Sequence, residues 1–80
     1  MKVFESKWVF EYLQSRNLIS QYKKAKEYML QGMYKQVDFK LKEPKKDKIY
    51  YFRINKQFRA IWKLNSDGIL VIWKIDNHQD

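Results

Sequence analysis

The chain has no cysteine and a single histidine, His78. The missing cysteine excludes disulfide bonds and thiolate metal sites, and it is typical of proteins in a reducing cytosol. One histidine argues against a histidine-based metal cluster. We therefore expect no metal and no other cofactor.

Long apolar runs are also missing. The longest, "GILVIW" at residues 68–73, is far too short to span a bilayer, and no basic-then-apolar signal peptide opens the sequence. The sequence has no internal repeat, linker or low-complexity segment. We expect one domain over residues 1–80 that is soluble, cytoplasmic and without a membrane partner.

What is abundant is positive charge. The 80 residues carry 17 Lys plus Arg against 9 Asp plus Glu, a net charge of +8, and 18% are aromatic. So short a chain buries only about 60–65% of its unfolded surface, so its core depends on aromatic packing or on a bound partner. The charge favours nucleic acid or an acidic protein as that partner, with an anionic membrane surface as an alternative.

The N-terminal third has helical periodicity. Ser6 is placed to cap a first helix, whose apolar residues Trp8, Val9, Tyr12 and Leu13 fall on one face. Ser20 is placed to cap a second helix that ends near Gly32. Its inward residues are expected to be Tyr22, Ala25, Met29 and Met33. The short connection predicts an antiparallel helical hairpin. Residues 1–4 could instead form a short edge strand, and the pattern leaves this open.

The remainder alternates as strands do. "VDFKLK" places Val37, Phe39 and Leu41 on one face, and "KIYYFRI", "FRAIWKL" and "GILVIWKI" are rich in β-branched and aromatic residues. "NSDG" before the last of them is a hairpin turn, with Gly68 at the position that needs positive φ. The predicted fold class is α+β: an N-terminal helical hairpin packed on one face of a three- to four-stranded antiparallel sheet.

Two arginines flank the turn in "FRINKQFRAIW", residues 52–62. If the loop is Asn55-Lys56-Gln57, Arg53 lies directly opposite Arg59 on the same face of the sheet. A four-residue loop would put them on opposite faces. Because alternation places Ala60 and Trp62 toward the core, Arg59 is expected to point away from it.

The last strand should return to the same edge of the sheet. It would bring "IDNHQD", and with it His78, beside Arg53 and Arg59. Two arginines and one histidine form a phosphate-sized site with a group that titrates near neutral pH. Such a site suits RNA cleavage without a metal. The guanidinium fork matches the phosphate oxygens, and the histidine transfers protons between the 2′-hydroxyl and the leaving 5′-oxygen.

A basic stretch follows the helices and would track the nucleic-acid backbone. Its residues are Lys40, Lys42, Lys45, Lys46 and Lys48. A base would stack on Tyr50, Tyr51 or Trp73 if one of these rings faces the groove. Each feature also has a plainer interpretation, in which exposed cations are solvated or paired and most of the aromatic residues form the core.

These residues together resemble the RelE/ParE superfamily, the toxin halves of bacterial type II toxin–antitoxin modules. The resemblance covers nearly the whole chain: a helical hairpin, "YYFRINKQFRAIWKL", a glycine turn, a hydrophobic strand and a terminal "IDNHQ". Its most specific part, "RINKQFRAIW", is similar to the paired-arginine segment of the YoeB-like branch. The resemblance implies a single RelE-like toxin domain.

The implied activity is endonucleolytic cleavage of mRNA on the ribosome. By position, Arg59 matches the phosphate-contacting arginine, His78 the catalytic histidine and Arg53 a second basic residue. Glu43 sits where YoeB-like toxins carry a general-base glutamate, so either Glu43 or His78 is left as the base. Tyr51 lies in a strand where RelE uses lysines, and Gln79 stands where YoeB-like toxins have tyrosine. The implied partners are the ribosome, mRNA and an antitoxin with an acidic segment.

Two alternatives belong to other functional classes. One is a ParE-like toxin that inhibits DNA gyrase by contact, although the terminal histidine does not belong to that pattern. The other is a relative that has lost catalysis and binds only the antitoxin.

Overall fold

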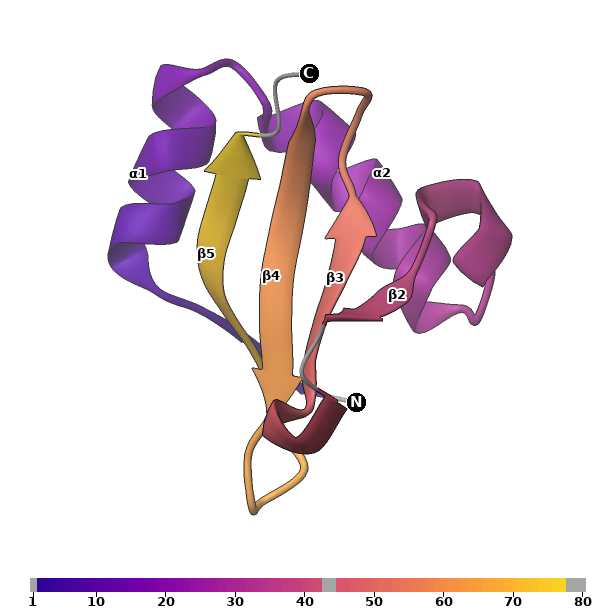
Figure 1. Cartoon of the computed structure of the whole chain (residues 1–80). Helices are drawn as coiled ribbons and strands as arrows, with labels where there is room; N and C mark the ends of the chain where they lie inside the picture. The colour runs from indigo at the N-terminus through magenta and orange to yellow at the C-terminus, as the bar shows by residue number, and fades with distance from the viewer. Residues whose placement is uncertain (1, 43–44, 78–80) are drawn as a thin grey trace.

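A computed structural model of the chain describes residues 2–42 and 45–77. It has an α+β fold with two helices, two 3₁₀ turns and a five-stranded mixed sheet (Figure 1). In chain order the elements are β1 (Val3–Glu5), α1 (Lys7–Ser15), α2 (Ile19–Leu30), η1 (Tyr34–Val37), β2 (Lys40–Lys42), η2 (Lys45–Asp47), β3 (Ile49–Arg53), β4 (Phe58–Leu64) and β5 (Leu70–Asn77).

The sheet has the strand order β1-β5-β4-β3-β2. Strands β2 to β5 form the expected antiparallel meander, but β1 adds a fifth strand that runs parallel to β5. The predicted sheet of three to four antiparallel strands therefore has too few strands. The observed sheet is mixed, because β1 runs parallel to β5. A three-residue strand is too short to show periodicity, which is why the sequence left residues 1–4 undecided.

The two helices begin and end for local reasons. Ser6 is the N-cap residue of α1 as predicted, although its hydroxyl makes no capping hydrogen bond. The helix α2 ends in a Schellman motif, in which Gly32 has φ of +78° and the Met33 N–H donates to the Tyr28 carbonyl at 2.9 Å.

The prediction that Ser20 caps α2 was wrong, because this helix begins at Ile19. The helix α1 also ends in a Schellman motif, with Asn17 in the left-handed region and the Leu18 N–H donating to the Leu13 carbonyl at 2.8 Å. Leu18, the apolar residue after Asn17, is buried. The chain therefore turns immediately after α1, and α2 begins before the predicted cap at Ser20.

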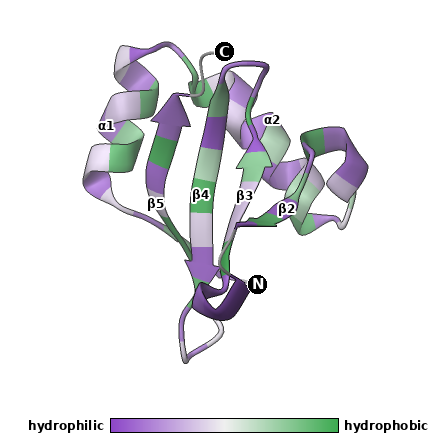
Figure 2. Cartoon of the chain, viewed as in Figure 1, coloured by the Kyte–Doolittle hydropathy of each residue, from purple (hydrophilic) through white to green (hydrophobic). Residues whose placement is uncertain are grey.

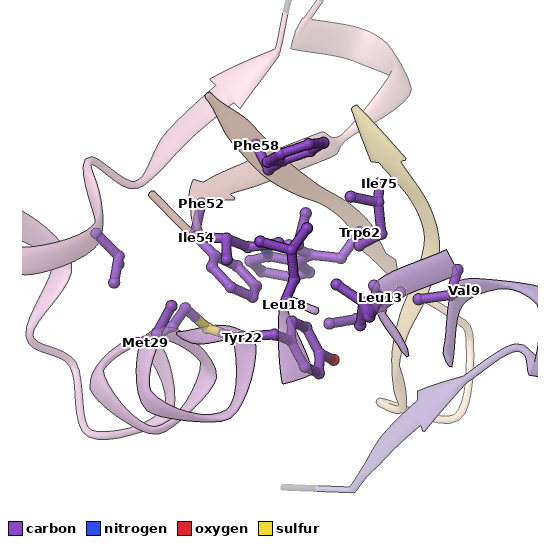
Figure 3. Packing of buried hydrophobic residues seen from close by; sticks show 14 of the residues in the cluster. Val9, Leu13, Leu18, Tyr22, Met29, Phe52, Ile54, Phe58, Trp62 and Ile75 are labelled. Atoms are coloured by element: carbon purple, nitrogen blue, oxygen red, sulfur yellow. The ribbon is translucent and has the colours of Figure 1, made fainter. Parts of the chain in front are cut away.

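Both helices pack on one face of the sheet, and the core lies between them and the strands (Figure 3). Val9, Leu13 and Tyr22 from the helices meet Phe52 and Trp62 from the sheet. Two predicted inward residues were wrong. Trp8 is 48% exposed because it lies one residue off the stripe formed by Val9 and Leu13, and Met33 is 41% exposed because it follows the helix end.

The predicted strand at residues 37–42 is shorter in the structure. Val37 closes the 3₁₀ turn η1, and Asp38 is left-handed with φ of +50°, so pairing starts only at Lys40. Val37 is nevertheless buried in the core as expected. Phe39 packs its ring against those of Tyr50 and Trp62, with centroids 5.6 and 5.7 Å away.

Strand β1 is tied to α2 by a small polar cluster. The Tyr22 hydroxyl donates a hydrogen bond to Glu5 Oε2, and Lys26 Nζ lies 3.1 Å from the same oxygen. Burial, together with the hydrogen bond to Glu5 and its negative charge, raises the pKa of the Tyr22 hydroxyl well above its ordinary value. In the part of the chain that the structure describes, no helix is long and apolar enough to cross a membrane.

Candidate phosphate site on the uncovered sheet face

The turn between β3 and β4 fixes the register of the two arginines. The Asn55 side-chain oxygen accepts hydrogen bonds from the backbone N–H groups of Gln57 and Phe58, at 2.8 and 2.9 Å. The Ile54 N–H donates to the Phe58 carbonyl at 2.8 Å, which closes a three-residue loop. Arg53 and Arg59 are therefore directly paired across the hairpin, which confirms the predicted register.

Both arginines occupy strand positions that alternate with the buried Phe52 and Ala60, on the side of the sheet opposite the core. We call this side of the sheet the outer face. Its outward strand positions are Phe4, Lys40, Lys42, Ile49, Tyr51, Arg53, Arg59, Ile61, Lys63, Val71, Trp73, Lys74 and Asp76. Six of these side chains are cationic, and Asp76 is the one carboxylate among them. The outer face therefore favours anionic ligands.

The Arg59 guanidinium lies over an aromatic ring. Its guanidinium carbon lies 4.9 Å from the centroid of the Tyr51 ring. Across the next strand pair Arg59 is opposite Asp76. Within residues 2–42 and 45–77, no carboxylate oxygen comes within 4.0 Å of the Arg59 guanidinium nitrogens. Its hydrogen-bond donors therefore remain available for a phosphate.

Arg53 has a partner. Its Nη2 lies 3.3 Å from Asp38 Oδ2, and Lys40 Nζ lies 3.7 Å from the other oxygen of the same carboxylate. The Arg53 and Asp38 side chains are 43% and 35% exposed, and an ion pair so accessible contributes only about 0–1 kcal/mol. A phosphate with two charge-assisted contacts would compete with Asp38 for Arg53.

The end of β5 lies beside this hairpin. Asp76 pairs with Arg59 and Asn77 pairs with Phe58, while Gln57 Nε2 donates to Asn77 Oδ1 at 3.0 Å. The expected return of the last strand to the arginine edge is confirmed as far as Asn77. His78 follows Asn77 in the sequence and lies outside the described residues, and so does Glu43.

The five predicted backbone-contacting lysines do not all lie near the arginines. Lys40 and Lys42 are on β2 opposite Tyr51 and Ile49, and both point to the outer face. Lys45 and Lys46 belong to η2, which precedes β3 and lies at the opposite end of the sheet (Figure 2, dark purple). Lys48 follows η2 and is also exposed.

The length of strand β3 alone, about 13 Å, separates the end of the sheet that carries η2 from the end that carries the arginine hairpin. The lysines therefore extend away from the arginine pair along the β2 edge of the sheet instead of surrounding it.

Several site residues were not identified from the sequence. Alternation puts Lys63 on the same face of β4 as Arg59, although it was not assigned to the site, and Lys74 reaches this face through an irregularity in β5. Asp38 carried no signal, because its approach to Arg53 depends on the left-handed turn after η1.

A pocket of about 230 Å³ adjoins the arginine hairpin, between α2, η1 and the end of β3. Its charged and amide side chains are Gln21, Lys24, Gln36 and Arg53, and the Gln21 side chain accepts a 2.7 Å hydrogen bond from Asn55 in the hairpin loop. The pocket is smaller than the roughly 300–1,000 Å³ of whole-ligand sites.

Comparison with known proteins adds no family assignment. No protein-family model matches the chain, and no curated protein matches it in sequence.

Proposed function

We propose that this chain is the toxin of a type II toxin–antitoxin module and acts as a ribosome-dependent mRNA endonuclease. The observation that carries the proposal is the direct pairing of Arg53 and Arg59 on the outer face. Like charges opposed across a hairpin destabilise it by up to about 1 kcal/mol, and a bound phosphate removes that cost. The sequence resemblance to RelE-like toxins supplies the substrate class.

The proposed reaction needs three tasks. The 2′-hydroxyl loses its proton and attacks the adjacent phosphorus, the phosphorus–oxygen bond to the 5′-oxygen breaks, and that oxygen gains a proton. Arg59 would bind the phosphate oxygens that gain charge in the transition state, since it is already oriented by Tyr51. Arg53 would exchange Asp38 for the same phosphate. These two groups give electrostatic stabilisation.

Proton transfer is assigned to His78, with Glu43 as the other candidate for general base. The unperturbed pKa of histidine lies near neutrality, which suits acid–base work at physiological pH. The position of Asn77 beside Phe58 supports the assignment of proton transfer to His78. Asn77 is the last residue of β5 and lies at the arginine hairpin, and His78 follows it in the sequence. The lysines Lys40 and Lys42, on the same face, would hold the RNA backbone.

The proposed partners follow from charge. The ribosome and its mRNA present phosphates, and an antitoxin with an acidic segment would cover the same cations when the toxin is inactive. A net charge of +8 on 80 residues suits all three. We also propose that the protein works in the cytoplasm, where translating ribosomes are found.

The test is a cell-free translation reaction in which new mRNA 5′ ends are mapped by primer extension. The wild-type protein should create ends inside the reading frame only when ribosomes are present. His78→Ala and Arg59→Ala should lose them, and Arg59→Lys should recover little because an ammonium lacks the planar fork. Lys56→Ala removes an exposed cation from the loop of the same hairpin and is the matched control that should cleave normally.

Each variant is first checked for an unchanged thermal unfolding transition. Intact mRNA with the wild-type protein would overturn the endonuclease proposal. DNA breaks in cells with intact mRNA would favour the gyrase-binding alternative. Cleavage by His78→Ala at the wild-type rate would remove the histidine from the mechanism.

A further inference from the structure

Strand β5 contains a bulge that changes which side chains reach the outer face. Ile61 pairs with Lys74 and Trp62 with Ile72, so Trp73 is an extra residue without a partner of its own on β4. Strict alternation from Ile72 would point Lys74 into the core and Ile75 out of it. The bulge reverses this, because Ile75 is buried and both Trp73 and Lys74 are exposed.

Trp73 therefore lies outside the core. Ile72 and Ile75, on either side of it in the sequence, are 0% and 5% exposed, whereas Trp73 is 36% exposed and does not pack with the core cluster. The ring of Trp73 is therefore partly accessible on the outer face. Trp73 on β5 and Phe4 on the neighbouring strand β1, which is 57% exposed, are the large apolar side chains exposed on the described outer face.

Of the aromatic side chains considered for base stacking, Trp73 alone has an available ring. Tyr50 faces the core and stacks on Trp62, with centroids 4.6 Å apart. One face of the Tyr51 ring is covered by the Arg59 guanidinium. Among the described residues, Trp73 takes part in no aromatic pair and no cation–π contact.

The surroundings of Trp73 suit a nucleic-acid strand. Lys74 is its neighbour in the bulge, and Lys63 lies opposite Val71 on the same face. Asp76, which is paired with Arg59, is three residues along β5 from Trp73, or about 10 Å. That distance corresponds to about three stacked nucleotides at 3.4 Å each.

We propose that the β5 bulge makes Trp73 a base-stacking subsite for single-stranded RNA, with Lys63 and Lys74 holding the backbone beside it. The choice of RNA rests on the proposed function, and the anionic nature of the ligand rests on the six cations of the outer face. Stacking on an aromatic side chain accepts any base, so Trp73 anchors the strand without selecting its sequence. Its role is substrate binding, at a distance from the reacting phosphate.

The experiment is fluorescence anisotropy with a labelled oligouridylate and with an abasic oligomer of the same sugar–phosphate backbone, both without ribosomes. Trp73→Ala should weaken oligouridylate binding by about 5- to 150-fold, and Trp73→Phe should recover much of the loss. Abasic oligomer binding should be weaker in the wild type and unchanged in Trp73→Ala. Trp8→Ala is the matched control, since Trp8 is an exposed tryptophan on α1, and it should bind like the wild type.

The salt dependence of RNA binding distinguishes the contribution of the Trp73 ring from that of the lysine charges. Trp73→Ala should leave the slope of log K against log salt unchanged, whereas Lys63→Gln and Lys74→Gln should each reduce it by about 1. Wild-type affinity for oligouridylate in Trp73→Ala, or an equal loss on both oligomers, would overturn the stacking proposal.

The two proposals fail independently. Trp73-dependent binding of oligouridylate together with intact mRNA in the translation reaction would reject the endonuclease and keep the stacking subsite. Ribosome-dependent cleavage by a Trp73→Ala protein with wild-type oligouridylate affinity would reject the stacking subsite and keep the endonuclease.

Discussion

The guanidinium of Arg59 lies 4.9 Å from the ring centroid of Tyr51, which is its diagonal neighbour on β3 and not its direct partner. Direct partners are Tyr51 with Ile61 and Arg53 with Arg59. The diagonal contact places the Arg59 guanidinium over the Tyr51 ring on the outer face. It also means that Tyr51, expected from the sequence to contact RNA, contacts the arginine.

Replacing Tyr51 should therefore impair Arg59. Tyr51→Leu removes a cation–π contact of about 0.5–1 kcal/mol, so we expect ribosome-dependent cleavage to slow by about two- to fivefold. Tyr51→Phe keeps the ring and should cleave almost as fast as the wild type. Initial cleavage rates by primer extension measure both, with thermal unfolding as the folding control. Equal losses in the two variants would instead assign the effect to the Tyr51 hydroxyl.

Asp38 should act as a competitor of the substrate. Its carboxylate lies 3.3 Å from Arg53 and 3.7 Å from Lys40, so Asp38→Asn releases two cations on the outer face. We expect tighter binding of oligouridylate and a slope of log K against log salt that is steeper by about 0.7–1.4. Asparagine is the suitable replacement because Asp38 has φ of +50°, which Asn tolerates.

Anisotropy titrations over a range of salt concentrations measure this effect. Lys63→Gln, which removes one cation of the outer face, calibrates what one charge does to the slope. Weaker RNA binding by Asp38→Asn would contradict the competition and make Asp38 a residue that orients Arg53.

The observed arginine register was one of two that the sequence allowed, and local chemistry at Asn55 decides between them. Asn55 is a residue whose side chain caps a tight turn, and a three-residue loop then fixes every pair in the hairpin. The approach of Asp38 to Arg53 was not predictable, because it follows from a left-handed residue after a 3₁₀ turn. Period-two alternation also does not reveal the β5 bulge, which decides where Trp73 and Lys74 point.

The parallel strand β1 was the largest omission in the fold. Its three residues carry no readable pattern, and its place is fixed by tertiary contacts with β5 and α2. The proposed acid–base groups, His78 and Glu43, lie outside the described residues, so their assignment rests on sequence chemistry and resemblance.

Gly32 should be required for its backbone conformation alone. Its φ is +78°, and a Cβ added there would meet no atom within 4 Å. Gly32→Ala should therefore lower the free energy of unfolding by about 1–2 kcal/mol through strain, while Gly32→Asn should cost less. Urea denaturation followed by circular dichroism measures both. An alanine variant as stable as the wild type would mean that the end of α2 relaxes to another conformation.

Tyr22 should make stability fall in alkaline solution. Its pKa is raised in the folded state by burial and by Glu5, whereas in the unfolded chain it is about 10. Above that pH the unfolded chain releases the proton and the folded protein keeps it, so the unfolded state binds fewer protons. The free energy of unfolding then decreases as pH rises, and the contribution is fully present only below about pH 10.

Tyr22→Phe isolates this effect. At pH 8 the variant should be less stable by about 1.5–3 kcal/mol, because a hydrogen bond to a charged carboxylate is lost. Between pH 9 and 11 its stability should decline less steeply than that of the wild type, since the variant lacks the Tyr22 hydroxyl whose pKa differs between the folded and unfolded states. Tyr34→Phe, at a half-exposed ring, is the control that should keep the wild-type slope. Parallel declines in wild type and Tyr22→Phe would show that β1 and α2 separate before Tyr22 titrates, and that the link between Glu5 and Tyr22 does not hold this edge of the sheet.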